Sequence, residues 1–412
     1  MLETLGRRAQ NAARVLAHIP SQQKNLALGA IASALRAAAP EILAQNMLDM
    51  KNAEENGMSS AFLDRLRLDG ARIDKIADSL LDVAALEDPV GRVIEQRVRP
   101  NGLRIEKIAV PLGVVGVIFE ARPNVTADSA ALCLKSGNAV ILRGGSDAIH
   151  SNIAIAAVIR AALEKAGLPA DCVQLVEDTS RESAVALMRL SEYINVIIPR
   201  GGRGLIRSVV ENATVPVIET GAGICHIYVD RAADPDMAAS VIYNAKTSHP
   251  SVCNAVECIL IHRDIAASAL PVIAAPLLEA GVEIRGDART CALLPGAVPA
   301  QDDDWGREYG ALILACRIVE DMEEALAHIQ RYGTGHSEAI LTQDDMAAAH
   351  FLENVDAAAV YHNASTRFTD GGEFGLGAEI GISTQKLHAR GPLGLRELCS
   401  MKYKIHGEGQ VR

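Results

Sequence analysis

Two hydrophobic patterns divide the chain. Up to about residue 90, apolar residues recur every three or four positions, as in NLALGAIASALRAAAPEILAQ, which is typical of amphipathic helices. This region is interrupted near Pro40, which predicts a pair of helices. From residue 114, short apolar runs such as VVGVIF, AVIL and INVIIP alternate with helical stretches. The second pattern predicts a parallel sheet covered by helices.

The alternating region predicts particular elements. We expect a helix after Asn124 that ends at Gly137, and a long helix capped by Ser146 that ends at Gly167. The run VPVIE is expected to be a strand that ends at Glu219. A second alternating run begins after residue 226 with ICHIYVD and CILIH. Together they predict an α/β protein with a doubly wound parallel sheet and a second α/β domain.

These changes of pattern suggest a domain organisation. Residues 1–226 are expected to form a cofactor-binding domain and residues 227–362 a catalytic domain. Residues 363–412 read as a glycine-rich return segment followed by a strand, SMKYKI. Asn101-Gly102, flanked by alternating residues, predicts a hairpin near 95–110. The hairpin and the last strand would form a small β element outside both α/β domains.

Composition excludes several classes of function. The 412 residues carry a net charge of −11 and only 3% aromatics, without a long basic run, which argues against nucleic-acid and anionic membrane partners. No apolar run approaches the ~18 residues of a membrane-spanning helix, and the start has no signal-peptide core. Eight scattered cysteines without a CxxC pair predict reduced thiols. We therefore expect a cytoplasmic protein without disulfides.

A nucleotide-binding fingerprint is absent. The stretch GGRGLIR follows the strand INVIIP, but Arg207 stands where the fingerprint GxGxxG needs its last glycine. In a looser interpretation, Gly201 and Gly202 form a turn before a helix, and the N–H groups at the helix N-terminus bind a phosphate. The alternative is that these glycines only make tight turns.

A second glycine turn, RGGSD, follows the strand AVIL. Arg143, Gly144 and Ser146 are candidates for the adenosine 2′-phosphate of a cofactor, because arginine binds phosphate through a planar fork. Asp147 would repel such a phosphate if it pointed inward. The alternative for Arg143 is an ion pair with a surface carboxylate.

Three further features accompany Cys253, which lies in the stretch SHPSVCNAVE. Asn124 in ARPNVT, after the strand VVGVIF, offers a side-chain amide donor. Glu219 in VIETGAG precedes a glycine-rich turn, 34 positions before the cysteine (253 − 219). A long glycine-rich segment, HNASTRFTDGGEFGLGAEIG, follows later.

These features resemble the aldehyde dehydrogenase superfamily, in which a glutamate precedes a nucleophilic cysteine by a similar distance and the cofactor site lacks GxGxxG. The stretches LRGGSDA, IPRGG, TSHPSVCNA and YGTGHSEAI narrow the resemblance to members that reduce γ-glutamyl phosphate, from about residue 5 to 405. The resemblance implies NADPH-dependent reduction of L-glutamyl 5-phosphate to L-glutamate 5-semialdehyde and phosphate, the second step of proline biosynthesis.

The resemblance also implies roles for individual residues. Cys253 would displace phosphate and form a thioester, after a following helical turn or the cofactor lowers its pKa from about 8.5. Asn124 and the backbone N–H of Cys253 would bind the oxyanion. Glu219 is a candidate for proton handling or for the cofactor side, or is a plain strand-end carboxylate. Glu308 in WGREYG resembles the glutamate that holds the nicotinamide ribose, although the motif is shifted by one residue.

Two arginines and one histidine complete the candidates. Arg367 and Arg390 suit the α-carboxylate or the phosphate of the substrate, or else they anchor loops. His249 stands four residues before Cys253, but no second His/Cys pair at ligand spacing supports a metal site. Cys258, in an apolar run, is expected in the core.

Two other functions remain open at this stage. One is a hydrolytic aldehyde dehydrogenase acting on a free semialdehyde; the wording TGAG after Glu219 and the HARGP tail argue against it. The other is a non-catalytic binding protein, which the joint presence of the candidate residues disfavours. We expect a homodimer or a tetramer, joined through the hairpin and the last strand, with the glutamate 5-kinase that supplies the substrate as a candidate partner. The sequence leaves the choice of NADPH over NADH, the oligomer size and the regulation open.

Overall fold

The computed structural model describes residues 2–412, with only the backbone at positions 60 and 61. The chain forms two compact units. Unit 1 comprises the residues up to Thr220, Gly375–Gly381 and Leu387–Arg412, and unit 2 comprises Gly221–Phe374 and Ile382–Lys386. The change of unit after Thr220 lies near the expected boundary at 226, and the glycine-rich return segment is divided between the two units. The functions expected of these segments remain predictions.

Unit 1 begins with five helices. The first three and the fifth contribute alanine- and leucine-rich faces to its main hydrophobic core, whereas Leu66 of the fourth belongs to a small separate cluster. The expected break near Pro40 is confirmed, because Ala38 separates two helices and Pro40 lies in the first turn of the second. No single helix among the described residues is long and apolar enough to cross a membrane. The two helices on either side of this break would together be long and apolar enough, but they are bent by 67° relative to each other. The five helices are α1 (Leu2–Leu16), α2 (Ser21–Ala37), α3 (Ala39–Glu55), α4 (Ser60–Leu66) and α5 (Gly70–Ala85).

The sheet of unit 1 is parallel, with the strand order β5-β4-β3-β6. Every residue of its two central strands is buried, which explains why they read as continuous apolar runs. Gly137 has a φ of +77° just after a helix, so the expected helix end is confirmed. The strands are β3 (Val114–Phe119), β4 (Ala139–Gly144), β5 (Val173–Leu175) and β6 (Val196–Arg200). The helices are α6 (Asn124–Lys135), α7 (Ile149–Lys165), α8 (Arg181–Met188) and α9 (Arg203–Asn212).

The prediction of a strand over VPVIE was wrong. Ile197 and Val217 form only an isolated bridge, and the Ile197 N–H donates to the Pro216 carbonyl at 2.8 Å. Proline has no N–H to continue a ladder of hydrogen bonds. Glu219 therefore follows an irregular segment instead of a regular strand.

The prediction that Ser146 caps the long helix was also wrong. Residues 146–148 form a 3₁₀ turn, and α7 begins at Ile149. The Asp49 carboxylate, from α3, accepts hydrogen bonds from the N–H groups of His150 and Ser151 at 3.2 and 2.8 Å. The cap comes from a side chain about one hundred residues away in sequence, which no local pattern reveals.

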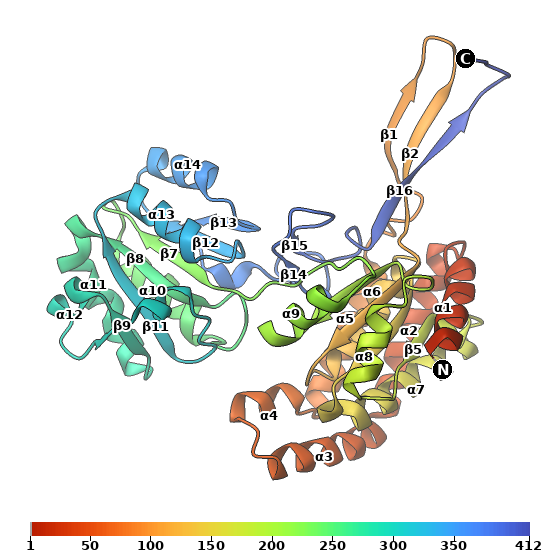
Figure 1. Ribbon diagram of the computed structural model, residues 1–412, viewed down its shortest axis with the longest axis horizontal. Helices are drawn as coiled ribbons and strands as arrows, with labels where there is room; N and C mark the ends of the chain where they lie inside the picture. Colours follow the sequence, from red (N-terminus) through yellow and green to blue (C-terminus); the bar gives the residue numbers. More distant parts are fainter. Residues whose placement is uncertain (1) are drawn as a thin grey trace. The chain divides into compact units, whose positions relative to one another are not determined.

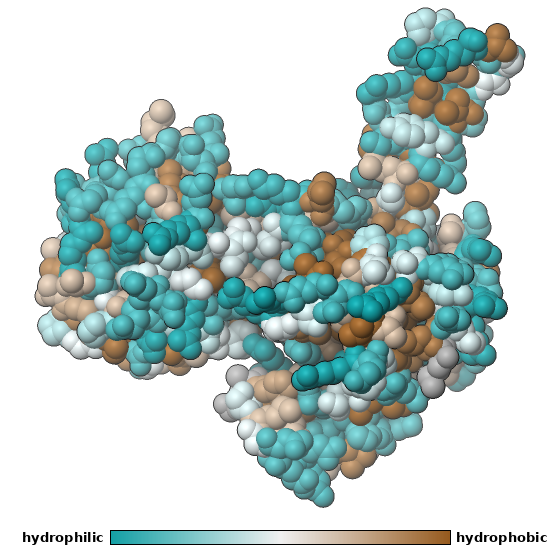
Figure 2. Space-filling model, in the orientation of Figure 1, coloured by the Kyte–Doolittle hydropathy of each residue, from teal (hydrophilic) through white to brown (hydrophobic). Residues whose placement is uncertain are grey.

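A separate three-stranded antiparallel sheet confirms the predicted hairpin. Figure 1 shows β1 (Val93–Val98), β2 (Arg104–Pro111) and β16 (Cys399–His406) side by side. The turn contains Gly102 at a φ of +89°, where glycine is favoured. Tyr403 and Ile405 are each 62% exposed, and Figure 2 shows apolar residues among hydrophilic ones on this sheet. The short strand β15 (Gly391–Pro392) also belongs to unit 1.

Unit 2 contains a seven-stranded parallel sheet in the order β10-β9-β11-β8-β7-β12-β13, with helices on its faces (Figure 1). The expected second α/β domain is therefore confirmed. Its strands are β7 (Cys225–Val229), β8 (Val256–His262), β9 (Glu283–Gly286), β10 (Val298–Pro299), β11 (Ile313–Val319), β12 (Ser337–Leu341), β13 (Ala359–His362) and the short β14 (Ile382–Ser383). Its helices are α10 (Pro235–Thr247), α11 (Arg263–Glu279), α12 (Ala288–Leu293), α13 (Met322–Tyr332) and α14 (Asp345–Asn354).

Candidate active site

Cys253 lies in a turn of unit 2 between α10 and β8, and it is partly buried. The residues after it form a turn that leads into β8 and do not form a helix. The Cys225 thiol donates to the Cys253 carbonyl oxygen at 3.2 Å. A Cβ atom on Gly223 would lie 1.4 Å from that same oxygen. The backbone of the candidate nucleophile is therefore held closely by two neighbours.

The next residue, Asn254, ties this turn to the glycine-rich segment. Its amide donates to the carbonyl oxygens of Thr369 at 2.9 Å and Arg367 at 3.2 Å, and the Thr366 hydroxyl donates to the Asn254 carbonyl at 2.7 Å. The Arg367 guanidinium donates to the Asn254 side-chain oxygen and to the Ser248 hydroxyl. Arg367 is thus brought next to the nucleophile and serves at least as an anchor of its turn.

A buried ion pair spans the segment that carries Cys253. Lys246, at the end of α10, donates to Glu257 at 2.7 Å and to the Val256 carbonyl at 3.0 Å, and both charged side chains are almost fully buried. Burial raises the pKa of Glu257 to about 7 and lowers the pKa of Lys246. The second oxygen of Glu257 accepts from the Gly310 N–H at 3.2 Å. This pair fixes both ends of the nucleophile turn and the loop before β11.

The loop held in this way carries Glu308. This exposed carboxylate accepts a hydrogen bond from the Gly223 N–H at 3.2 Å. Gly223 in turn lies against Cys253, so the structure brings Glu308 close to the nucleophile despite the one-residue shift in its motif. Glu219, in contrast, lies at the end of the first long segment of unit 1, next to Thr220, whose hydroxyl donates to the Pro199 carbonyl at 2.6 Å.

Residues of the stretch YGTGHSEAI contact the neighbours of the nucleophile turn. The sequence analysis had assigned no role to these contacts. His336 contacts the Cys225 sulfur at 3.8 Å and the Ser337 hydroxyl at 2.8 Å. Ser337 and Tyr361 both hydrogen-bond the Thr369 hydroxyl, at 2.6 and 2.7 Å. Cys225, whose thiol hydrogen-bonds the Cys253 carbonyl, is therefore linked through a series of polar groups to the glycine-rich segment.

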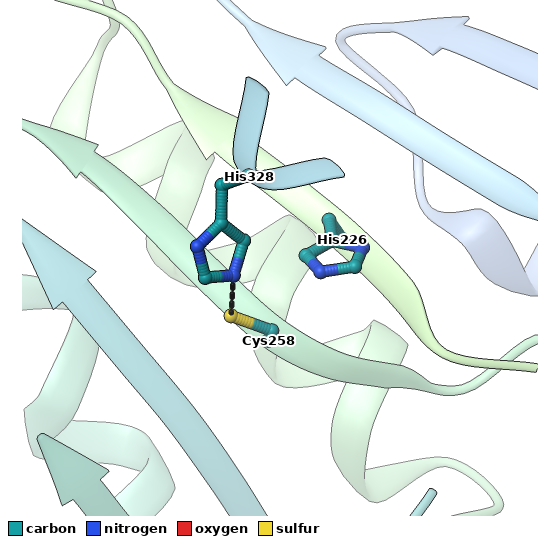
Figure 3. Close-up of side chains that lie close together, drawn as sticks. All are labelled: His226, Cys258 and His328. Carbon is teal, nitrogen blue, oxygen red and sulfur yellow. Dashed lines mark hydrogen bonds between the residues drawn. The ribbon is translucent and has the colours of Figure 1, made fainter. Parts of the chain in front are cut away.

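One further cluster joins β7, β8 and α13. Figure 3 shows the His328 ring pointing at Cys258, with His226 beside them, and their ligand-type atoms lie within 4.8 Å of one another. Arg317 donates to Nδ1 of His328 at 3.1 Å, so Nε2 carries the proton and donates to the Cys258 sulfur at 3.8 Å. Nδ1 of His226 hydrogen-bonds Glu338 at 3.0 Å.

The chemistry of this cluster favours a hydrogen-bond network over a metal site. The lone pair that His328 would give a cation is taken up by the proton, and Arg317 adds a positive charge next to the ring. Burial, with His226 and Arg317, lowers the pKa of His328 to about 3, which keeps the imidazole neutral. Cys258 is buried in the sheet, as expected.

In unit 1, Asn124 is the first residue of α6. Its amide nitrogen donates to the Asp128 carboxylate at 2.9 Å, and the Ser79 hydroxyl lies 3.5 Å from the other carboxylate oxygen. Burial raises the pKa of Asp128 to about 6, an effect reduced by the hydrogen bond from Asn124 and by the charge of Arg200. Sequence reasoning missed Asp128; the spacing of four residues on one helix was the available signal.

The glycine turn after β6 approaches Glu120 closely. The Gly202 N–H, at the start of α9, donates to the Glu120 carboxylate at 3.1 Å, and a Cβ on Gly201 would lie 2.5 Å from the same carboxylate. The helix N-terminus therefore already binds an anionic group. That observation fits the type of site expected for a cofactor phosphate, with Glu120 in its place.

The turn after β4 connects its arginine to the backbone of a neighbouring loop. Arg143 is only 8% exposed, and one of its terminal nitrogens donates to the Thr179 and Ser180 carbonyls at 2.6 and 2.8 Å. Burial lowers the pKa of Arg143. A Cβ on Gly144 would lie 2.2 Å from the Asn152 amide, so Gly144 serves the packing of β4 against α7. Arg143 anchors the loop after β5, and its partners are backbone carbonyls instead of the surface carboxylate considered above.

The two candidate arginines belong to different units. Arg390 belongs to unit 1, where it lines a cavity of about 390 Å³ together with Arg92 and Arg396 at the foot of the β1–β2–β16 sheet. Arg367 belongs to unit 2. His249 lies on the nucleophile turn, where its ring is 3.4 Å from the Ser251 hydroxyl.

With this geometry in place, similarity to known proteins defines the class. The chain matches the aldehyde dehydrogenase family model over residues 2–282, and it belongs to that family. An acetylating aldehyde dehydrogenase from Geobacillus thermoglucosidasius shares the fold at 18% identity, with a TM-score of 0.73 over 100% of this chain and 97% of that one.

Within the family, the chain belongs with the γ-glutamyl phosphate reductases. It is 57% identical to γ-glutamyl phosphate reductase 1 of Bacillus licheniformis, over 98% of each chain. It is also 57% identical to the γ-glutamyl phosphate reductase of Heliobacterium modesticaldum, over 100% of this chain and 99% of the relative. The crystal structure of the γ-glutamyl phosphate reductase from Thermotoga maritima is 49% identical, with a TM-score of 0.96 and coverage of 100% and 99%.

Proposed function

We propose that the protein catalyses the nicotinamide-dependent reduction of L-glutamyl 5-phosphate to L-glutamate 5-semialdehyde and phosphate, the second step of proline biosynthesis. The main support for this proposal is the similarity to γ-glutamyl phosphate reductases over the full length of the chain. Neither a hydrolytic aldehyde dehydrogenase nor a binding protein is supported by these relatives. The thiol of Cys253 in its constrained turn supplies a nucleophile suited to this reaction.

The reaction runs through acyl transfer to Cys253. Its sulfur attacks the carbonyl carbon of the acyl phosphate, a carbon–sulfur bond forms, and phosphate leaves with the electron pair of the broken carbon–oxygen bond. The reduced nicotinamide cofactor, when bound, supplies a hydride. The thioester accepts the hydride at its carbonyl carbon, the carbon–sulfur bond breaks, and the semialdehyde leaves as the thiolate re-forms. The departing phosphate takes up one proton per turnover, and the hydride donor is the only reductant consumed.

Four other side chains have proposed roles. Asn124 and the Cys253 backbone N–H donate to the developing oxyanion. Glu308 binds the cofactor on the nicotinamide side, supported by its position next to Gly223. Arg367 holds the nucleophile turn and offers charge to the substrate. Glu219 remains a candidate for proton handling.

Three more candidates concern binding in unit 1. The turn at Gly201 and Gly202 is proposed to bind the cofactor phosphates, supported by the carboxylate that already lies at this helix N-terminus. Arg390 is a candidate for an anionic group of the substrate, since two other arginines line the same cavity. Ser146 keeps a place near the cofactor only as a donor in the 3₁₀ turn.

The proposed cofactor is NADPH. A nicotinamide cofactor follows from the family, whereas the preference for the phosphorylated form rests on the resemblance of the chain to its specific relatives. The ratio of kcat/KM for NADPH and NADH tests the preference. A ratio above ten supports it, and a ratio below one overturns it.

Partners and location are part of the same proposal. We expect a cytoplasmic enzyme that forms a homodimer or a tetramer through the β1–β2–β16 sheet, whose outer strands and apolar side chains are available for pairing. The glutamate 5-kinase that makes the unstable acyl phosphate is proposed as a transient partner.

The dependence on phosphate tests the proposed reaction against hydrolysis. In the reverse direction, L-glutamate 5-semialdehyde and oxidised cofactor should give sustained cofactor reduction only when inorganic phosphate is added, because phosphate must release the acyl group from Cys253. A single turnover without phosphate agrees with this scheme. Sustained turnover without phosphate would instead identify a hydrolytic enzyme. The variant Cys253→Ser controls for cofactor reduction that does not involve the thiol.

A further inference from the structure

The Asn124 amide is held in place by a carboxylate on its own helix. Asp128 lies four residues further along α6, on the same helix face, and its Oδ2 accepts the Asn124 Nδ2–H at 2.9 Å. An ionised carboxylate can only accept hydrogen bonds. The contact therefore fixes which end of the amide is the nitrogen, and it leaves the second N–H to point elsewhere.

The surroundings of Asp128 do not contain the ion pair that usually stabilises a partly buried carboxylate. Within residues 2–412, no cation lies within 4.0 Å of its carboxylate, and its second hydrogen-bond partner, the Ser79 hydroxyl of α5, is at 3.5 Å. Lys75 on α5 and Arg200 at the end of β6 act on it only from a distance. A partly buried carboxylate without an ion pair costs stability. Its main hydrogen-bond partner is the Asn124 amide, which in the proposed function donates to the oxyanion.

We propose that Asp128 is a positioning residue, which in its ionised form aims the free N–H of Asn124 at the carbonyl oxygen of the substrate. This inference rests on the proposed function, in which Asn124 is the oxyanion donor. An amide that rotates freely spends much of its time with its oxygen toward the oxyanion, where it repels the developing charge. An accepted hydrogen bond on one N–H removes that orientation and also polarises the other N–H.

The same contact predicts a dependence on pH. Burial raises the pKa of Asp128 to about 6, while Asn124, Arg200, Ser79 and Lys75 favour the ionised form. Protonation turns one carboxyl oxygen into a donor, so the hold on the amide weakens below this pH. We expect kcat to fall as the pH falls through about 6.

The test compares two substitutions of Asp128, each alone and combined with Asn124→Ala. Asp128→Ala removes the acceptor and should lower kcat roughly tenfold with little change in the KM of the cofactor. Asp128→Asn keeps an oxygen acceptor, so it should recover much of kcat but lose the acid limb of the pH profile. In the Asn124→Ala background, either substitution should change kcat less than about twofold, because coupled residues are not additive. Asp82→Asn, an exposed acid on α5, is the matched control and should leave kcat and its pH profile unchanged.

Two outcomes overturn the inference. A loss from Asp128→Ala that is fully retained in the Asn124→Ala background would show that Asp128 acts independently of the amide. An acid limb that persists in Asp128→Asn would show that another group titrates. If Asp128→Ala does not fold, as judged by its unfolding temperature, Asp128→Asn and its double variant decide the question. Unchanged kcat in Asn124→Ala alone would refute the catalytic role of Asn124 in the proposed function, and Asp128 would lose its proposed role with it.

Discussion

Gly223 lies against the backbone of Cys253 so closely that a Cβ atom would sit 1.4 Å from the Cys253 carbonyl oxygen and 2.9 Å from its Cα. No side chain other than hydrogen fits there without moving the nucleophile turn. The Gly223 N–H also donates to Glu308. This glycine therefore sets the distance between the strand that follows it and the turn that carries the thiol.

Gly223→Ala should displace the nucleophile and lower kcat at least a hundredfold, because catalysis is sensitive to misplacement of about 1 Å. Steady-state kinetics and the unfolding temperature check this expectation. Gly29→Ala is the matched control: it is a helical glycine with no atom within 4 Å of the added Cβ, so activity should be kept and the helix slightly stabilised. Full activity of Gly223→Ala would contradict the close approach.

Lys246→Met should destabilise unit 2 by about 3–5 kcal/mol, because it leaves Glu257 buried without its cation. The pKa of Glu257 already lies near 7 and should rise further without the ammonium. The folded state then binds a proton that the unfolded state has lost, so stability should fall more steeply than in the parent as the pH rises from about 5 to 8. Denaturant unfolding across this pH range measures both effects.

The double variant Lys246→Met with Glu257→Leu completes this prediction. Replacing both charges by apolar groups should recover most of the lost stability and remove the added pH dependence. Stability that remains as low as in the single variant would show that Lys246 acts mainly through the Val256 carbonyl, its second partner.

Arg143→Ala should weaken the loop after β5, because the Thr179 and Ser180 carbonyls lose their donor. We expect a lower unfolding temperature and a similar loss of kcat/KM with NADPH and NADH. A loss confined to NADPH would instead assign Arg143 to the 2′-phosphate. Kinetics with both cofactors, on the same preparation, separates the two outcomes.

The outward residues of β16 test the proposed assembly. Tyr403→Lys with Ile405→Lys changes two side chains that are each 62% exposed, so the fold of a single chain should be unaffected. Burial of these side chains between subunits would make the charges costly, and the oligomer should dissociate at micromolar concentration. Light scattering of parent and variant gives the mass. A parent protein that is a stable monomer at this concentration would contradict the proposal.

Much of the architecture could be read from local pattern. The buried strands β3 and β4 appear as unbroken apolar runs, the end of α6 is marked by Gly137, and the hairpin is marked by Asn101-Gly102. These signals come from short-range physics, namely burial on both faces and the φ angles that glycine allows.

The failures arose where distant residues decide the local structure. Asp49 caps α7 from another helix, which makes Ser146 unnecessary as a cap. Pro216 interrupts a run whose hydrophobicity alone suggested a strand.

Only part of the candidate site could be predicted from the sequence, because some of its residues matter through contacts with distant parts of the chain. Cys253 and Glu308 stand in recognisable stretches, and the fold brings both to Gly223. Asp128 and the Lys246–Glu257 pair carry no signal beyond helix spacing or a charge in an apolar run, because their importance lies in burial and partners. Sequence thus identifies the reacting groups more readily than the residues that hold them.

The covalent intermediate on Cys253 tests the central claim most directly. The enzyme, mixed with L-glutamate 5-semialdehyde and oxidised cofactor without phosphate, is quenched in acid, digested and analysed by mass spectrometry. The account predicts a glutamyl adduct on the peptide that contains Cys253, its disappearance when phosphate is added before the quench, and its absence in Cys253→Ser. An active enzyme that accumulates no adduct on Cys253, or a Cys253→Ser variant with undiminished turnover, would contradict the account.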